Sequence, residues 1–228
     1  MVTRDHAQAR VAVDLVVFTI RGGLLHLLLV KRGNPPFRHR HALPGGFVRR
    51  GEDLLDAAVR ELREETRLDA NLFHIEQVHT YGAPKRDPRG RIFSVAYLAI
   101  VPNLPTPVGG TDALSAHLVP VAKVGKLAFD HNKIVTDALE VARTKLEYTT
   151  LAVSFCPETF TITDLRKVYE AVWERELDAR NFHRKVLATQ GFVVDAHRKR
   201  ASPAGRPPAE YRAGKAIALH PPMLRSSY

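Results

Sequence analysis

The sequence has little cysteine and no long apolar run. Cys156 is its single cysteine, which excludes a disulfide framework and a zinc site built from several cysteines. No stretch of about 18 apolar residues is present, so no transmembrane helix is expected. The first ten residues lack the apolar core of a signal peptide. With 45% apolar and 25% charged residues, the composition predicts a globular protein of the cytoplasm.

Positive charge is concentrated near the end of the chain. The 228 residues carry a formal net charge of +10 and give an isoelectric point near 10.0. Residues 180–228 contain ten Lys and Arg against two acids, whereas the preceding residues are almost balanced. A basic end on a near-neutral body indicates a polyanionic partner, first of all nucleic acid. The alternative is a solubilising tail.

The first two thirds of the chain predict a mixed α+β domain. Arg21-Gly22-Gly23 is typical of a hairpin turn. The clearest helix is expected over residues 52–68, with Asp53 as its cap, and a second over residues 129–146. Phe129-Asp130-His131 are expected to cap this second helix, and a ligand contact is the alternative. The apolar face of the first helix is predicted to consist of Leu55, Ala58, Val59 and Leu62. Strands are expected over residues 11–20, 24–30, 75–81 and 92–101.

Three glutamates of the first helix share one face. Glu61, Glu64 and Glu65 lie at spacings of three and four, which places their carboxylates side by side. Hard divalent cations such as Mg²⁺ favour such an all-oxygen environment and also bridge to phosphate oxygens. Arg60 can pair with a carboxylate of this face. The alternative is a solvated helix held by Arg60–Glu64 and Glu64–Arg67 ion pairs.

A longer pattern surrounds these glutamates. Leu43-Pro44-Gly45-Gly46 and Glu52 precede the run Arg60-Glu61-Leu62-Arg63-Glu64-Glu65 at fixed spacings, and Leu68 follows it. The pattern resembles the Nudix box, a loop–helix–loop that binds Mg²⁺ and a nucleoside diphosphate linked to another group. The resemblance implies three metal ligands, Glu61, Glu64 and Glu65. It further implies that Glu52 is a ligand or an orienting carboxylate, and that all four glutamates are catalytic if the domain is active. The ligand-binding residues that it implies are Gly45, Gly46 and Arg60.

One position departs from the Nudix box. The family has glycine two residues after the last glutamate, and this sequence has Arg67. A glycine there ends the helix in the left-handed conformation, which costs another residue about 1 kcal/mol or forces a different exit. Arg67 also adds a cation close to the carboxylates. The departure therefore bears on catalysis more than on fold.

The pattern changes beyond a predicted boundary in residues 147–157, which separates a domain of residues 1–148 from one of residues 149–228. A helix is expected over residues 161–173 with Thr163 as its cap, and a second over residues 178–189, capped by Asp178 and ended at Gly191. A short strand at residues 192–194, a basic loop at 197–206 and a return strand at 209–212 follow. Helix, turn, helix and hairpin together predict a winged helix-turn-helix.

The second of these helices combines a basic face with an apolar back, predicted to be Phe182, Val186 and Leu187. Such a helix fits a DNA major groove, where Arg and Asn recognise base edges and Lys neutralises phosphate. A basic wing beside it suits the phosphate backbone or the minor groove. The alternatives are a solvated helix and a loose basic loop. The predicted DNA contacts are Arg180, Asn181, His183, Arg184 and Lys185 of the helix and Arg198, Lys199, Arg200 and Arg206 of the wing.

Motifs in the C-terminal part make the resemblance more specific. After the Nudix box come Phe160-Thr161-Ile162-Thr163-Asp164-Leu165, Asn181-Phe182-His183-Arg184-Lys185, Gly191-Phe192 and Gly205-Arg206-Pro207. Together they resemble the NrtR family, Nudix-related transcriptional regulators of NAD metabolism. The resemblance implies a Nudix α/β/α sandwich followed by a winged helix-turn-helix. It also implies a homodimeric repressor of NAD biosynthesis or salvage genes, with operator DNA and the effector ADP-ribose as partners.

The sequence therefore supports two possible functions. The first is a DNA-binding repressor whose Nudix domain senses ADP-ribose. The alternative is an Mg²⁺-dependent Nudix hydrolase of ADP-ribose or a related nucleoside diphosphate derivative. The glutamates support both, whereas the charge asymmetry and the helix-turn-helix outline support only the repressor, which we favour. Whether the domain turns its ligand over stays open.

Overall fold

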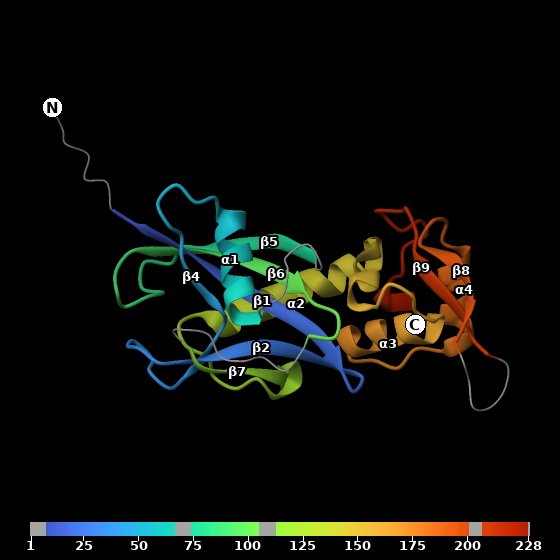
Figure 1. The fold of residues 1–228 in the computed structure, drawn as a ribbon, viewed down its shortest axis with the longest axis horizontal. Helices are drawn as coiled ribbons and strands as arrows, with labels where there is room; N and C mark the ends of the chain where they lie inside the picture. Colours follow the sequence, from blue (N-terminus) through green and yellow to red (C-terminus); the bar gives the residue numbers. More distant parts are fainter. Residues whose placement is uncertain (1–7, 67–73, 105–112, 201–206, 228) are drawn as a thin grey trace. The chain divides into compact units, whose positions relative to one another are not determined.

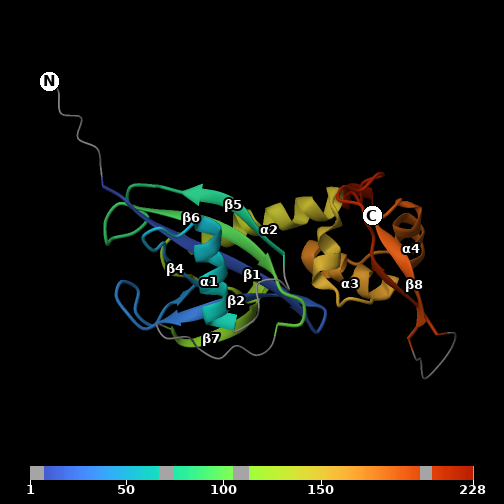
Figure 2. The ribbon, with the colours of Figure 1, turned by 45° about the horizontal axis from the view of Figure 1, so that its top comes forward.

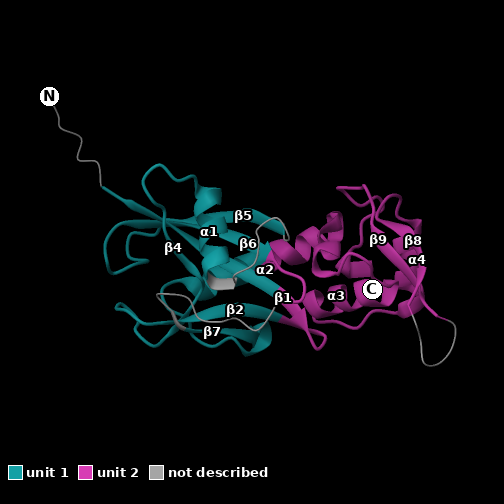
Figure 3. Ribbon diagram, viewed as in Figure 1, with its two compact units in different colours: residues 1–18, 26–99, 104–138 teal, residues 19–25, 100–103, 139–228 magenta. Residues whose placement is uncertain are grey.

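The computed structural model describes residues 8–66, 74–104, 113–200 and 207–227 (Figure 1). The predictions for Arg67, Leu68 and Arg206 lie outside these ranges, and the side chain of Glu65 is likewise not described. The chain divides into two compact units (Figure 3). Unit 1 comprises residues 1–18, 26–99 and 104–138, and unit 2 comprises residues 19–25, 100–103 and 139–228.

A seven-stranded sheet forms the body of unit 1, in the order β3-β2-β1-β6-β5, with β4 paired to β1 and β7 paired to β2. Residues 13–19 of β1 are buried without interruption, and β6 is buried almost throughout, which is typical of strands covered on both faces. The helix α1 (Leu54–Thr66) covers one face, and α2 (His131–Tyr148) begins on the other (Figures 1 and 2). This arrangement confirms the predicted α/β/α sandwich. The strands are β1 (Arg10–Arg21), β2 (Leu24–Arg32), β3 (His41–Ala42), β4 (Gly45–Phe47), β5 (His74–Tyr81), β6 (Ile92–Ile100) and β7 (Ala113–Pro120).

Most predicted elements of unit 1 are present, with three differences. Gly22 and Gly23 both have positive φ angles, as the hairpin turn between β1 and β2 requires. The strands β3, β4 and β7 were not predicted. Asp53 accepts a hydrogen bond from the backbone N–H of Leu55, as expected of a helix cap. The side chain of Leu55 is 45% exposed, so its predicted place on the apolar face is wrong. The predicted Ala58 and Leu62 are buried, and Ala57 is buried beside them.

Unit 2 contains two helices and a hairpin. The helices α3 (Ile162–Trp173) and α4 (Ala179–Ala188) are followed by the antiparallel strands β8 (Val193–Lys199) and β9 (Ala209–Ala213). Tyr169 packs edge-on against both Trp173 and Phe182, which joins α3 to α4. This is the expected winged helix-turn-helix. The segment predicted to hold the domain boundary contains a 3-10 helix, η3 (Thr150–Phe155), that buries Leu151, Ala152 and Phe155.

Three predictions for unit 2 are corrected. The cap of α3 is Thr161, not Thr163, because Thr161 and Asp164 exchange side-chain-to-backbone hydrogen bonds in a capping box. Leu187 is 48% exposed and does not belong to the apolar back of α4. The strand β8 continues to Lys199 through residues predicted as loop. The predicted cap of α4 is confirmed, since Asp178 accepts the N–H of Asn181 at 2.7 Å.

The last described segment is fastened to α2 by one arginine. Arg225, at the start of η4 (Arg225–Ser227), donates to Glu147 at 2.9 Å and to Glu140 at 2.7 Å. The backbone N–H of Met223 also donates to the carbonyl of Glu147, and the Met223 side chain is buried. In the part of the chain that the structure describes, no helix is long and apolar enough to cross a membrane.

Candidate functional site

Arg60 of α1 binds the carboxylates of two predicted site residues, Glu52 and Glu61. Its guanidinium group forks onto Glu52, with Nε–Oε1 at 2.6 Å and Nη2–Oε2 at 3.0 Å, and its Nη1 donates to Glu61 at 2.5 Å. The hydrogen bonds from Arg60 and from the backbone N–H of Arg49 lower the pKa of Glu52 to about 2. Because both carboxylate oxygens of Glu52 accept these bonds, the geometry favours the orienting role for Glu52 over the ligand role.

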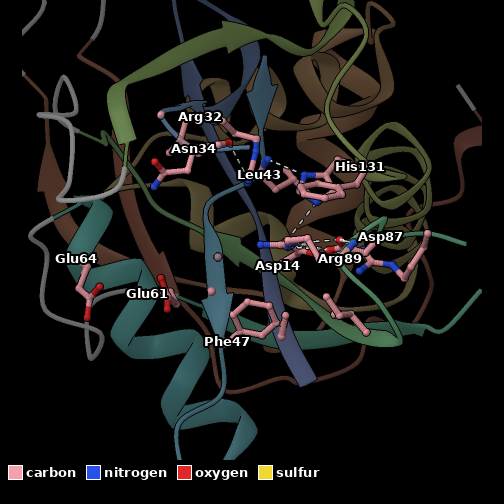
Figure 4. A pocket seen from close by; sticks show the side chains of 18 of the residues that line it. Asp14, Arg32, Asn34, Leu43, Phe47, Glu61, Glu64, Asp87, Arg89 and His131 are labelled. Carbon is pink, nitrogen blue, oxygen red and sulfur yellow. Dashed lines mark hydrogen bonds and ion pairs between the residues drawn. The ribbon is translucent and has the colours of Figure 1, made fainter. Parts of the chain in front are cut away.

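Glu61 and Glu64 extend from α1 toward a cavity (Figure 4). Burial raises the pKa of Glu61 despite its bond to Arg60. Glu64 is more exposed and lies 3.4 Å from Arg49 and 3.5 Å from Arg60. Glu61 also touches the backbone of β4, since a Cβ atom on Gly46 would lie 2.1 Å from its Oε1. A side chain at position 46 and the observed place of Glu61 are therefore incompatible.

We expect Gly46→Ala to weaken divalent-metal binding by about 10- to 100-fold, the range seen when the groups that orient a metal ligand are disturbed. The added methyl group displaces the Glu61 carboxylate from its contact with β4. Calorimetric titration with MnCl₂ measures the effect. Gly125→Ala is the matched control, because nothing lies within 4 Å of a Cβ atom there. Equal manganese affinity in both variants would contradict the role given to Glu61.

The donor chemistry of this face fits a magnesium ion. Glu61 and Glu64 supply carboxylate oxygens, the ligands that Mg²⁺ prefers. In this structure the same carboxylates are neutralised by Arg60 and Arg49. Among the described residues, no three His, Cys, Asp or Glu side chains are grouped so that they could hold a metal ion. The side chain of Glu65 is not among those described. Glu61 and Glu64 are thus the described side chains that suit the ion.

The cavity in front of α1 has a volume of about 430 Å³, within the range of small-molecule sites. Basic side chains outnumber acidic ones along it, which suits an anionic ligand. Gly45 and Gly46 of β4 belong to its wall, as predicted from the sequence. Its charged lining consists of Lys31, Arg32, Arg49, Arg60, Arg86 and Arg89 with Asp14, Glu61, Glu64 and Asp87.

A buried ionic network lies at the side of the cavity opposite α1, around Asp14 (Figure 4). Ser94 donates a hydrogen bond to Asp14 Oδ2, and Arg86 Nη2 lies 3.5 Å from the same oxygen. Arg86 also forks onto Asp130 at 3.0 and 2.7 Å, and its side chain is only 3% exposed. Sequence reasoning missed this network. The available signal was Asp14, a charged residue within the apolar run of β1.

His131, the first residue of α2, faces Asp14. Its Nδ1 accepts the backbone N–H of Leu43 at 2.9 Å, so the neutral ring carries its proton on Nε2, which lies 3.5 Å from Asp14 Oδ1. Burial lowers the pKa of His131 below its usual value near 6.5. His131 lines the cavity and Asp130 pairs with Arg86. The backbone carbonyl of Asp130 accepts the N–H groups of Lys133 and Ile134, so the segment begins α2 as expected from the sequence, and His131 also lines the cavity.

The depressed pKa of His131 predicts lower stability in mild acid. The unfolded chain takes up a proton near pH 6.5, and the folded chain does so only at lower pH. The free energy of unfolding therefore falls as the pH drops below about 6.5. His131→Gln is expected to flatten this dependence between pH 7.5 and 5.5, measured by urea unfolding. Thr136→Ala, at an exposed and non-titrating position of α2, should leave it as it is; the same slope in both variants would count against His131.

Guanidinium groups and aromatic rings alternate along the rest of the wall. Arg89 lies 5.2 Å from the ring centres of both Phe47 and Phe129, and Arg32 lies 4.8 Å from Phe129. Asp87 holds the Arg89 guanidinium through a fork at 3.0 and 2.7 Å. Arginine forks recognise phosphate oxygens, and aromatic faces stack on flat rings. The cavity therefore suits a phosphorylated compound with a planar group.

In unit 2, the predicted DNA-binding residues fall into two groups, one on the helix α4 and one in the wing formed by β8 and β9. Arg180, His183 and Arg184 of α4 are exposed, and Asn181 and Lys185 are half-buried. The Nη2 of Arg184 donates to the side-chain oxygen of Asn181 at 2.9 Å, which steadies the guanidinium at the surface.

In the wing, Arg198 and Lys199 are exposed on β8. Arg200 is ion-paired with Asp164 at 2.8 Å and with Glu210 at 3.0 Å, so it fastens the wing to the start of α3 and to β9. Arg198 and Lys199 are therefore turned to solvent, as is Arg212 on the neighbouring strand β9. Arg200 combines its charge with a structural role.

The fold and the site define a class: a Nudix domain joined on one chain to a DNA-binding winged helix. The NUDIX domain model matches residues 8–138, and the model of the NrtR DNA-binding winged helix domain matches residues 152–213. The chain belongs to the NrtR family.

Three relatives illustrate the likeness. The ADPR responsive transcriptional repressor NtrR of Acinetobacter baylyi is 32% identical over 90% of this chain and 82% of its own. Shewanella oneidensis NrtR, solved in complex with a 27mer DNA, matches with a TM-score of 0.76 at 30% identity, over 89% of this chain and 93% of that one. Its NUDIX domain, solved with ADP ribose, matches with a TM-score of 0.55 at 32% identity over 61% of this chain and 92% of that one. An ADP-ribose pyrophosphatase of Methanocaldococcus jannaschii is 42% identical over 49% of this chain and 64% of its own.

Proposed function

We propose that this protein is an ADP-ribose-responsive transcriptional repressor that acts in the cytoplasm on genes of NAD biosynthesis or salvage. The observation that carries the proposal is the presence, in one chain, of a Nudix cavity lined by arginines and a winged helix with a basic, exposed α4. We assign ligand sensing to residues 1–148 and DNA binding to residues 149–228. The relatives from Acinetobacter and Shewanella support both assignments.

The cavity offers each part of ADP-ribose a chemical match. The guanidinium groups of Arg32 and Arg89 suit the diphosphate, and Phe47 and Phe129 suit the adenine ring. The Asp14 carboxylate suits a ribose hydroxyl group. Arg60 and Glu52 hold the box helix and its loop together beside the ligand. Mg²⁺ held by Glu61, Glu64 and Glu65 would neutralise diphosphate oxygens next to these groups.

Unit 2 supplies a surface that matches the DNA major groove. Arg180 and Arg184 project from α4, whose other side is anchored by the fully buried Phe182 and Val186. We assign DNA contacts to Asn181, His183 and Lys185 beside them, and to Arg198, Lys199, Arg200 and Arg206 of the wing. A homodimer would present two copies of α4 to half-sites about one helical turn apart. ADP-ribose then releases the repressor if it favours a spacing of the helices that does not fit the operator.

A second candidate activity is hydrolysis of ADP-ribose. It is favoured by the likeness to the pyrophosphatase of Methanocaldococcus jannaschii and by the retained glutamates. For this reaction a divalent metal ion would supply an activated water for attack on a pyrophosphate phosphorus, and Glu61, Glu64 and Glu65 would hold that ion. We assign binding of the ion to Glu61 and Glu64, which line the cavity, and orientation of Arg60 to Glu52, which accepts its hydrogen bonds. Hydrolysis and sensing are compatible, because a slowly cleaved ligand still shifts the DNA-binding equilibrium.

A single mixed assay tests both activities. Purified protein is incubated with Mg²⁺ and with labelled DNA from upstream of NAD-synthesis genes, with and without ADP-ribose, and the nucleotide is then analysed by chromatography. We expect a shifted DNA band that ADP-ribose releases. Absence of binding in both conditions would refute the repressor. Binding that ignores ADP-ribose would refute the sensor, and conversion of the nucleotide to AMP would establish the hydrolase.

A further inference from the structure

One large apolar side chain lies on the solvent side of α4. Leu187 is 48% exposed, whereas Phe182 and Val186 of the same helix are fully buried. Phe182 packs edge-on against Tyr169 of α3. Phe182 and Val186 therefore already provide the apolar contact of α4 with the rest of unit 2. The fold of unit 2 therefore leaves the outer part of Leu187 unused.

Leu187 shares its exposed face with the cations proposed to contact DNA. Arg180, Arg184 and Leu187 lie at spacings of four and three, which places them on one stripe of the helix. Arg184 is steadied by Asn181 through a 2.9 Å hydrogen bond, one turn before Leu187. A groove that receives Arg184 thus also receives Leu187.

Major-groove edges expose hydrogen-bonding atoms together with one apolar group, the C5-methyl of thymine. We infer that Leu187 contacts a thymine methyl group beside the base that Arg184 recognises, and thereby determines part of the operator sequence. The inference rests on the proposed DNA-binding function and assigns a residue that the basic pattern alone does not indicate. The same exposed leucine adds nothing to binding of the phosphate backbone, because an alkyl group forms neither a hydrogen bond nor an ion pair with phosphate.

The test uses the full-length protein and a duplex that it selects from a random-sequence library. Each thymine of that duplex is replaced in turn by uracil, which removes only the C5-methyl group, and affinity is measured by fluorescence anisotropy. We expect at least one replacement to weaken wild-type binding about three- to fivefold, the contribution of one buried methyl-sized group. In Leu187→Ala the same replacement should have no effect. Ile217→Ala, at an 85% exposed position outside α4, should keep the wild-type response.

The outcomes separate this inference from the function on which it rests. If the wild type tolerates uracil at every position, the proposed contact of Leu187 with a thymine methyl group is overturned while DNA binding stands. The same holds if a uracil effect persists in Leu187→Ala. Failure of the wild type to select any duplex refutes the repressor, and the inference falls with it. Since Leu187 is outside the core, the thermal unfolding of Leu187→Ala followed by circular dichroism should match that of the wild type.

Discussion

Replacing Arg86 with methionine is expected to lower the free energy of unfolding by about 3–5 kcal/mol. Arg86 is almost fully buried and pairs with Asp130 through a fork and with Asp14 at 3.5 Å. Methionine fills part of the volume but leaves both carboxylates without their cation. The cost arises because a buried charge that loses its partner keeps its desolvation penalty. The variant should also bind ADP-ribose poorly, since Asp14 and its neighbour His131 line the cavity.

Urea unfolding followed by circular dichroism measures this change. Trp173 is the single tryptophan and belongs to unit 2, so its fluorescence follows that unit by itself. A transition that moves in circular dichroism but not in fluorescence would place the damage in unit 1. Lys133→Met is the control, because it breaks an exposed ion pair with Asp137 and should cost about 1 kcal/mol or less. If both variants lowered the free energy of unfolding equally, the buried network would contribute no more to stability than an exposed ion pair.

Arg184→Ala is expected to weaken operator binding by about 5- to 150-fold, the 1–3 kcal/mol typical of a lost arginine–guanine contact. Arg184 is exposed on α4, and its hydrogen bond to Asn181 fixes the guanidinium before DNA arrives. Arg184→Lys keeps the charge but not the fork, so it should recover only part of the affinity. Because the side chain is outside the core, stability should be unchanged.

Fluorescence anisotropy at fixed salt measures these affinities. Lys126→Ala removes an equal charge from an exposed position of unit 1 and should leave binding within about twofold of the wild type. The loss in Arg184→Ala should be largest for the selected operator and small for unrelated DNA, since phosphate contacts do not distinguish sequences. A uniform loss on both DNAs would reduce Arg184 to a phosphate contact.

Local patterns were sufficient to predict the main helices of both units and most of the strands, but not β3, β4 and β7. The spacing of Glu61 and Glu64 placed them on one helix face, where the structure has them, and Asp178 is the cap of α4 as expected. Apart from the cap of α3, which is Thr161 and not Thr163, the errors came from packing. Leu55 and Leu187 fit an apolar period yet are exposed, because the period says which residues share a face but not how wide a stripe the neighbouring elements cover. The strand β7 was missed as well, because its partner β2 lies some 90 residues earlier in the sequence and local patterns do not show such a pairing.

The amino-acid sequence by itself determined the Nudix box, the winged-helix outline and the concentration of positive charge near the end of the chain. These features are set by spacing within a helix or a turn, which depends on neighbouring residues alone. Only the tertiary structure decided that Asp14, Arg86 and His131 meet at one side of the cavity, since 72 residues separate the first two along the chain. It also decided that Arg200 holds the wing while Arg184 faces solvent. Identical side chains acquire different roles because the fold, not the local pattern, determines which charges find a partner.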